Sequence, residues 1–162
     1  MSYFSGIVDT DDHVRLGGYP GALRDMLGVR VEEFFPLLPG QVLELSTGAS
    51  GSRWSELLTL TGAQALATIA SGPLAGTPAV TRHAHGEGSA TYVATDLDPV
   101  SLGALLLDEV RRAGLGPVAD APPGVEVVRR GDRLFVLNHT AADAVLAGTT
   151  VEAGGAVVLR GS

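Results

Sequence analysis

Residues 78–113 read PAVTRHAHGEGSATYVATDLDPVSLGALLLDEVRRA, and they carry the clearest structural signals in the chain. Two runs rich in β-forming residues, Pro78–His85 and Ser89–Thr95, flank the short segment Gly86–Gly88. A glycine-bearing loop of this length between two such runs is typical of a β-hairpin. We therefore expect two antiparallel strands at this point.

A helix is predicted directly after the hairpin, from Pro99 to Ala113. Asp98 is a preferred N-cap residue, and proline is favoured in the first helical turn. Leucines follow at helical spacing, two arginines occupy the last turn, and Gly114 ends the helix. A hairpin followed by a helix indicates a mixed α/β organisation for residues 1–115.

Glycine and proline divide the upstream part into short elements. We expect a strand at Tyr3–Val8, a helix at about Pro20–Leu27 that Gly28 ends, and a strand at Val29–Phe35. The same reasoning predicts strands at Val42–Leu45, Trp54–Leu60 and Ala65–Ala70, with a loop at Ser46–Ser52.

The chain changes character after residue 115. Residues 116–124 hold three prolines and no apolar periodicity, which is typical of a linker. Strands are predicted beyond it at Val125–Arg130, Arg133–Asn138 and Ala156–Arg160. We expect one α/β domain over 1–115, a linker over 116–124 and a small antiparallel β-domain over 125–162.

Composition excludes several classes of function. The chain has 162 residues, no Cys and a net charge of −7, and all 11 basic residues are Arg. Disulfides, thiolate nucleophiles and lysine-dependent phosphate loops are therefore impossible. An acidic chain disfavours nucleic-acid binding, and no apolar run approaches membrane-spanning length. We expect neither a nucleic acid nor a membrane as partner.

Two motifs suggest ligands, and each has a plainer structural explanation. Gly17–Gly21 precedes a helix as a phosphate loop would, but it lacks the required glycine spacing, so a tight turn is favoured. His83 and His85 would face one side of a strand, where Glu87 or Asp96 could add a carboxylate. Zinc needs more ligands than this pair supplies, so we expect no metal and no cofactor.

Two further candidates point to hydrolysis and fail on geometry. Glu32 and Glu33 are adjacent on a predicted strand and point to opposite faces, whereas a glycosidase needs two converging carboxyl groups. Ser50 lies in a glycine-rich loop, but Ser52 replaces the second glycine of a nucleophile elbow. We expect no catalytic residue.

Trp54 and a basic cluster are candidates for binding. Trp54 is more often a core or interface anchor than a platform for a substrate. Arg129, Arg130 and Arg133 surround a Gly-Asp turn, and solvated arginines at a hairpin explain them, including the Arg-Gly-Asp triplet.

Several longer strings together resemble the trimerisation domain of glycoside hydrolase family 42 β-galactosidases. They are DHVRLGGYPGALRD at 12–25, LGVRVEEF at 27–34, GTPAVTRH at 76–83 and YVATDLD at 92–98. The strings GVEVVRR at 124–130 and LFVLNHT at 134–140 are similar to the small C-terminal β-domain of that family. The resemblance covers most of the chain and is weakest at 40–56 and 141–155.

The resemblance implies both a fold and a role. The implied fold is part of a glutamine-amidotransferase-like, flavodoxin-like α/β domain followed by a small antiparallel β-domain. The family's catalytic barrel needs about 250 residues, and neither it nor its two catalytic glutamates match this chain. We expect a non-catalytic cytoplasmic fragment whose partners are further copies of itself or a barrel-containing β-galactosidase chain.

Two more expectations follow from the same resemblance. Tyr3–Gly6 matches the end of an inner strand, so we expect the chain to begin inside the trimerisation domain. The alternative role is a free-standing module that binds carbohydrate or protein through Trp54 and the β-rich tail.

Overall fold

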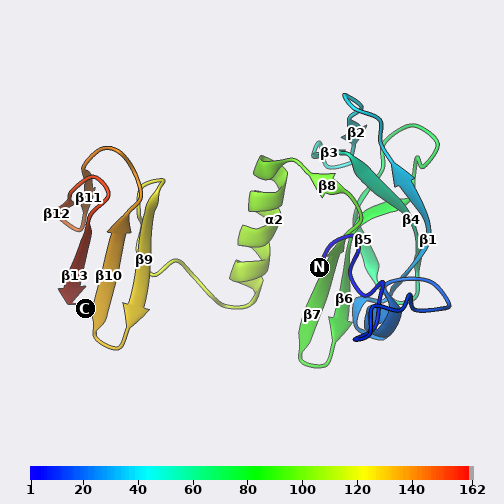
Figure 1. Ribbon diagram of the computed structural model, residues 1–162, viewed down its shortest axis with the longest axis horizontal. Helices are drawn as coiled ribbons and strands as arrows, with labels where there is room; N and C mark the ends of the chain where they lie inside the picture. The colour runs from blue at the N-terminus through cyan, green and yellow to red at the C-terminus, as the bar shows by residue number, and fades with distance from the viewer. Residues whose placement is uncertain (161–162) are drawn as a thin grey trace. The chain divides into compact units, whose positions relative to one another are not determined.

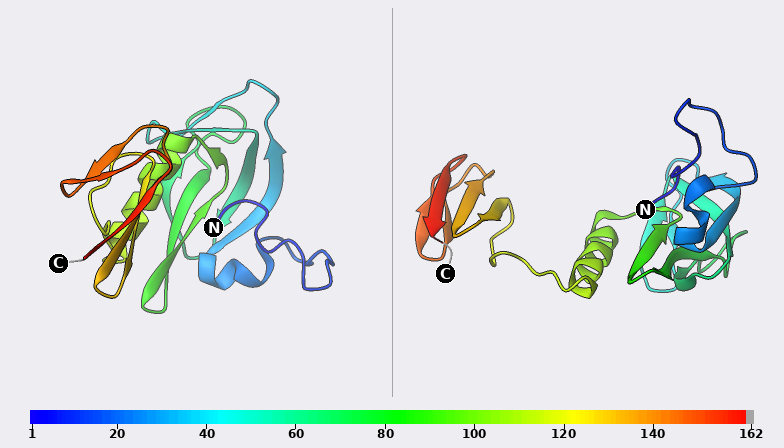
Figure 2. Two further views of the ribbon diagram at one scale, coloured as in Figure 1. Left: turned by 60° about the vertical axis from the view of Figure 1, so that its left-hand side comes forward. Right: turned by 90° about the horizontal axis from the view of Figure 1, so that it is seen from below.

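The computed structural model describes residues 1–160 (Figure 1). The chain divides into two compact units, Met1–Glu109 and Val110–Ser162. Each unit is built mainly of short antiparallel strands, as the two further views also show (Figure 2).

The helices are few and, except for one, short. They are the 3₁₀ helix η1 (Gly21–Leu23), α1 (Arg24–Leu27) and α2 (Pro99–Arg112). The strands of the first unit are β1 (Val29–Pro36), β2 (Leu43–Glu44), β3 (Ser50–Ser52), β4 (Trp54–Leu60), β5 (Gln64–Thr68), β6 (Pro78–His85), β7 (Gly88–Val93) and β8 (Asp96–Leu97). Those of the second unit are β9 (Val125–Arg130), β10 (Arg133–Asn138), β11 (Ala144–Leu146), β12 (Thr149–Val151) and β13 (Ala156–Arg160).

The expected flavodoxin-like α/β fold is wrong. Every strand pairing over residues 1–160 is antiparallel, and the parallel contact is the isolated bridge between Ser2 and Val93. Parallel neighbours need crossover connections of a dozen or more residues, usually helical, whereas hairpins need only a few. The strands at residues 78–93 are joined by a short hairpin turn and are therefore antiparallel, and the other strand pairs of the unit are antiparallel as well.

The predicted hairpin is confirmed as β6 and β7, and it lies at the centre of the first unit. β6 also pairs with β5 on its other edge. Thr81 and Tyr92 are opposite one another and buried on the face toward α1, while Val80 and Val93 are buried on the other face. The sheet therefore separates two apolar clusters.

The predicted short helix that ends at Gly28 is confirmed, and its end is closely packed. Gly28 has a φ of 62°, and a Cβ there would lie 2.6 Å from the ring of His83 and 2.7 Å from the nitrogen of Ala63. The Gly28 carbonyl accepts the backbone N–H groups of Thr61 and Ala63 at 2.8 and 3.1 Å. Glycine is required here both for its conformation and for its size.

Two local predictions are wrong. Tyr3–Val8 is not a strand, because Phe4 and Gly6 both take φ of 64° and the chain turns there. Part of the predicted loop Ser46–Ser52 is the strand β3, which pairs with β2 and β8. Gly51 packs directly against Thr95, a distant residue that no local pattern reveals.

The second unit is antiparallel β, as predicted. β9, β10 and β13 form one sheet with β10 in the centre (Figure 1), and the hairpin of β11 and β12 was not predicted. Val136, Leu146 and Val151 form its buried core. The Asn138 side-chain amide donates to the carbonyl oxygens of Ala142, Val151 and Glu152 at 2.8 to 3.0 Å, which ties the hairpin to the sheet.

Candidate interaction surfaces

Helix α2 is fixed at its start by Asp98, the predicted N-cap. One carboxylate oxygen accepts the backbone N–H groups of Val100 and Ser101 at 3.0 and 2.9 Å. The other accepts both the backbone N–H and the hydroxyl of Ser50 at 3.2 Å. Hydrogen bonds from Ser101 and then Ser50 hold the pKa of this carboxyl well below its usual range. The cap thus joins α2 to β3.

Arg82 of β6 fixes the other end of α2. Its guanidinium donates to Asp108 at 2.8 Å, and both Nε and Nη2 donate to Glu109. Thr91 of β7 donates to the same Glu109 oxygen at 2.8 Å. The Arg82 side chain is only 16% exposed, so the ion pair is largely shielded from solvent. The helix is therefore held by polar contacts at both ends.

Between these two ends α2 buries no residue, although it is rich in leucine. Leu106 and Leu107 are each 56% exposed, Val100 is 83% exposed and Leu102 39%. Single exposed apolar residues are ordinary, but a contiguous apolar face marks an interaction site. At about 3.6 residues per turn, Leu102 and Leu106 lie on one side of the helix and Val100 and Leu107 on another. The side with Leu102 and Leu106 is therefore the candidate for contact with another protein surface.

A groove lies beside α2, and we call it the α2 groove. It has a volume of about 610 Å³. The helix side consists of Leu102, Leu105, Leu106 and Glu109. The opposite side is formed by Met1, Ser2, Tyr3, Ser89, Thr91, Val93, Thr95, Asp96 and Leu97. The lining thus mixes apolar side chains with hydroxyl and carboxylate groups, a combination that is typical of binding sites.

The N-terminal residues form one side of this groove by pairing with β7. Val93 donates its backbone N–H to Met1 at 2.9 Å, and Tyr3 donates to Val93 at 3.1 Å. The terminal amine donates to the Thr91 carbonyl at 2.8 Å, and burial lowers its pKa. Residues 1–3 thus extend the sheet of β5, β6 and β7 on its β7 edge.

Trp54 belongs to a cluster of five aromatic rings. Its ring centroid lies 4.5 Å from that of Phe4, 5.2 Å from Phe34 and 6.1 Å from Tyr3. Tyr19 stacks on Phe34 at 5.1 Å. Trp54 is half-buried among these rings, which agrees with the predicted role of an anchor.

Glu56 is a buried carboxyl group beneath the aromatic cluster. It is 1% exposed, and it accepts the Trp54 indole N–H at 3.3 Å and the Tyr92 hydroxyl at 2.7 Å. Burial raises the pKa of Glu56, and the two hydrogen bonds only partly oppose that rise. Glu56 has no distinguishing signal in the sequence, because it lies in an ordinary strand pattern two residues after Trp54.

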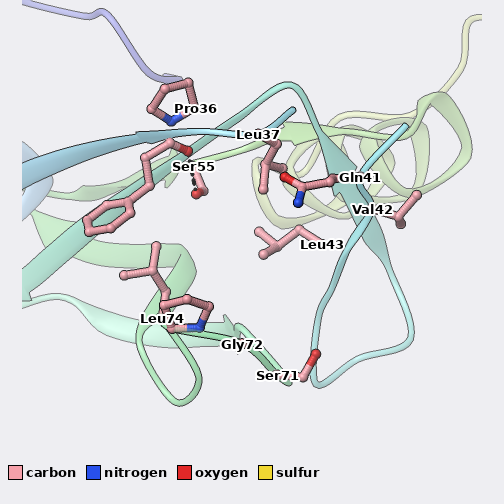
Figure 3. Close-up of a pocket in the computed structure, with 11 residues that line it drawn as sticks. Pro36, Leu37, Gln41, Val42, Leu43, Ser55, Ser71, Gly72 and Leu74 are labelled. Carbon is pink, nitrogen blue, oxygen red and sulfur yellow. Dashed lines mark hydrogen bonds between the residues drawn. The ribbon is translucent and has the colours of Figure 1, made fainter. Parts of the chain in front are cut away.

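A second, smaller cavity of about 380 Å³ lies between the β1–β2 connection and the loop at 71–74 (Figure 3). Its lining, which includes Leu37, Leu43 and Leu74, contains no ionisable residue. Gln41 accepts the Leu38 N–H at 2.8 Å and Ser55 donates to Phe35 at 2.8 Å, so these polar groups already have partners. The cavity has the character of a packing gap.

The structure separates the predicted metal candidates. His83 is half-buried against Gly28 and donates its Nδ1–H to the Met26 carbonyl at 3.0 Å, whereas His85 is exposed near the hairpin tip. A different group could hold a metal ion in the part of the chain described: Asp9, Asp11 and His13. Their ligand atoms all lie within 4.8 Å of one another.

The other candidates have structural partners. Glu32 forms a two-point ion pair with Arg30 at 2.8 and 2.7 Å, and Glu33 follows a bulge in the pairing of β1 with β4. Ser50 contacts Asp98 as described above. Gly17–Gly21 is a loop whose carbonyl groups at Gly17 and Gly21 accept the Arg24 guanidinium.

Comparison with known proteins defines the class. Residues 1–116 match the family model described as the β-galactosidase trimerisation domain. A β-galactosidase from an Arthrobacter species is 50% identical over 99% of this chain, and the LacZ β-galactosidase of Heyndrickxia coagulans is 47% identical over 86% of it. The crystal structure of a β-galactosidase from Bacillus circulans sp. alkalophilus superposes with a TM-score of 0.88 at 31% identity, over 99% of this chain and 28% of that one.

The chain therefore belongs to the β-galactosidase trimerisation domain family. This result confirms the resemblance identified from the motifs at 12–34 and 76–98. The chain spans 22 to 23% of the length of these two relatives. No helix within residues 1–160 has the length and apolar character needed to cross a membrane.

Proposed function

We propose that this chain supplies the non-catalytic part of a β-galactosidase, which holds subunits together and supports a barrel-containing β-galactosidase chain. The observation that carries the proposal is the α2 groove. Its helix presents leucines to solvent while polar contacts at Asp98 and Arg82 fix both helix ends. A rigid, preformed apolar face lowers the entropic cost of association.

The occupant of the α2 groove is an apolar segment of the barrel-containing chain. The groove edge carries Glu109 and Asp96, which are already paired with Arg82 and Arg53. An apolar segment can therefore enter without stripping water from an unpaired charge there, which would be costly. The proposed division of the chain remains a domain over 1–115, a linker over 116–124 and a β-domain over 125–162.

The proposed role is scaffolding rather than hydrolysis, and the protein acts in the cytoplasm. Glu56, the most deeply buried carboxyl group over residues 1–160, uses both oxygens to accept hydrogen bonds from Trp54 and Tyr92. A glycosidase needs two carboxyl groups about 5–9 Å apart on either side of the scissile bond. The neighbours of Glu56 are aromatic rings, which supply no second carboxyl group.

The test is copurification with a chain of the Arthrobacter relative that ends before the region aligned here. We expect the tagged wild-type chain to retain that partner and Leu106→Asp to lose it. Leu107→Asp is the matched control, because Leu107 is equally exposed but does not line the groove. Absence of copurification, or equal loss in both variants, contradicts the proposal.

A further inference from the structure

Three arginines lie in a row across the sheet of the second unit. Arg133 in the central strand β10 is directly opposite Arg130 of β9 and Arg160 of β13. Directly opposite residues of an antiparallel sheet point to the same face, and neighbouring strands are about 4.8 Å apart. All three residues are exposed. We call this set the arginine row.

The arginine row is unfavourable unless something anionic covers it. Like charges directly opposite each other on a sheet destabilise it. The arginines that form ion pairs over residues 1–160 are Arg30, Arg53 and Arg82, so no member of the row is among them. The two remaining pairs join His13 to Asp9 and His139 to Glu126. A solvated hairpin turn explains one or two arginines, but not three aligned across three strands.

Next to the arginine row, the same face of the sheet carries an apolar row. Phe135 is opposite both Val128 and Val158, two residues along each strand from an arginine. Phe135 is 37% exposed and Val158 is 50% exposed. Arginine and aromatic residues are enriched at protein interfaces and dominate their binding energy. The face therefore fits a protein segment that presents carboxylates beside apolar side chains.

Such a segment exists in the first unit, at residues 8–16, which we call the acidic loop. Asp9, Asp11 and Asp12 lie in this loop, and Val14 and Leu16 beside them are 57% and 91% exposed. Figure 2 shows this blue segment as a loop that projects from the strands of its unit. The loop thus offers three carboxylates flanked by exposed apolar residues.

The acidic loop is internally braced. Asp9 accepts the backbone N–H groups of Asp11 and His13 at 2.9 and 3.0 Å, and its own N–H donates to the His13 carbonyl at 2.9 Å. Arg15 donates its N–H to Ile7 at 2.8 Å. Because these contacts already hold the loop, binding orders little additional chain.

The charges of the two units are also complementary. Residues 1–109 carry thirteen acidic and five basic side chains, a net charge of −8, whereas residues 110–162 carry five acidic and six basic side chains, a net charge of +1. Complementary potentials favour contact between unlike units over contact between like units.

We propose that the acidic loop of one copy docks on the arginine row and adjacent apolar row of a second copy. The proposal rests on the subunit association proposed above and names the surfaces that make it. A contact between two different patches is heterologous, and heterologous contacts form a closed ring when the rotation between copies closes. The match of residues 1–116 to a trimerisation domain indicates a ring of three. Each copy then uses its loop toward one neighbour and its β-sheet toward the other.

The test is sedimentation velocity of the full chain over a range of concentrations, at low salt and at high salt. We expect a reversible trimer that dissociates as salt increases, because exposed charges are screened. Arg133→Glu places a carboxylate against the acidic loop and should weaken association by at least about 100-fold. Adding Asp11→Arg to Arg133→Glu should restore most of it. Thermal melts should show that Arg133→Glu does not destabilise the sheet, because it relieves repulsion within the row.

Arg129→Glu is the matched control. The Arg129→Glu substitution makes the same charge change next to Arg130 of the row. Arg129 is opposite Leu134, so its side chain lies on the other face of the sheet. A trimer that survives Arg133→Glu overturns this inference and leaves the proposed function standing. Equal weakening by Arg129→Glu, or association insensitive to salt, also overturns it. A wild-type chain that stays monomeric at every concentration contradicts subunit association itself.

Discussion

Replacing Glu56 by Gln should make the first unit more stable at neutral pH. The carboxyl group accepts one hydrogen bond from the Trp54 indole and one from the Tyr92 hydroxyl. A glutamine keeps both contacts, because its carbonyl oxygen accepts from the indole and its amide donates to the phenol oxygen. The substitution replaces a buried ionisable group by a neutral one without removing a hydrogen bond.

The pH dependence distinguishes this explanation from a general packing effect. Burial raises the pKa of Glu56 above its ordinary value of 4.5, so the folded state binds a proton more tightly than the unfolded state. The contribution of Glu56 is therefore fully present below about pH 4.5 and is lost as pH rises through the folded pKa. The pKa values of Asp98 and Asp9 are lowered from 3.8, so their effects fall at lower pH.

The Tyr92→Phe variant supplies the magnitude. It removes a 2.7 Å hydrogen bond to a buried carboxyl group, which typically contributes about 1.5–3 kcal/mol when that group is ionised. For a chain of this size the melting temperature should fall by roughly 3–12 °C. In Glu56→Gln the pairing partner is neutral, so Tyr92→Phe should cost less there than in the wild type.

The assay is urea unfolding followed by the fluorescence of Trp54, the single tryptophan of the chain, between pH 5 and pH 8. The free energy of unfolding of the wild type should decrease as the pH rises from 5 to 8, and this decrease should be absent in Glu56→Gln. Glu33→Gln, an exposed control on β1, should show the same pH dependence as the wild type. Parallel pH profiles for the wild type and Glu56→Gln would refute the reasoning.

Four further outcomes are expected. Asp98→Ala should lower the free energy of unfolding by about 1 kcal/mol through loss of the α2 cap, seen as lost helical circular dichroism; an unchanged signal would contradict that role. Gly28→Ala should lower the free energy of unfolding in urea by more than about 1 kcal/mol, because a Cβ there would lie 2.6 Å from the His83 ring. Gly40→Ala is the control, since nothing lies within 4 Å of a Cβ at that position. An equal loss of stability in both variants would contradict the steric explanation. Limited proteolysis should cut first within residues 116–124 and leave a product of roughly 110–120 residues by mass spectrometry, and a first cut inside α2 would place the boundary elsewhere. The purified chain should not hydrolyse a chromogenic β-galactoside, and turnover lost on replacing one of its own glutamates would reverse the non-catalytic assignment.

Local pattern was sufficient for the elements whose signals are contiguous in sequence. The hairpin of β6 and β7, the cap at Asp98 and the stop at Gly28 each depend on neighbouring residues, and each was predicted correctly. The family, too, was identified from strings at 12–34 and 76–98, because short runs in a fixed order are specific even when each one alone is not.

Sheet topology was not predictable in this way, and the α/β assignment was wrong for that reason. Strand direction depends on which distant segments pair, and neither the pairing of β3 with β8 nor the turn at Phe4 has a local signature. The resemblance supplied a family fold, whereas the pairing observed in this chain is antiparallel throughout its named strands.

The sequence by itself determined the family, the short elements and the absence of cysteine and lysine chemistry, because these depend on residue identity and local order. Only the tertiary structure decided which charges meet. Arg160 lies 27 positions from Arg133, yet the register of β10 and β13 places them opposite one another. Glu56 is an ordinary strand residue until Tyr92 and Trp54 close over it. Burial and cross-strand register both arise from long-range packing. They decide which side chains are exposed and which of them lie side by side, and so they define the candidate surfaces of this protein.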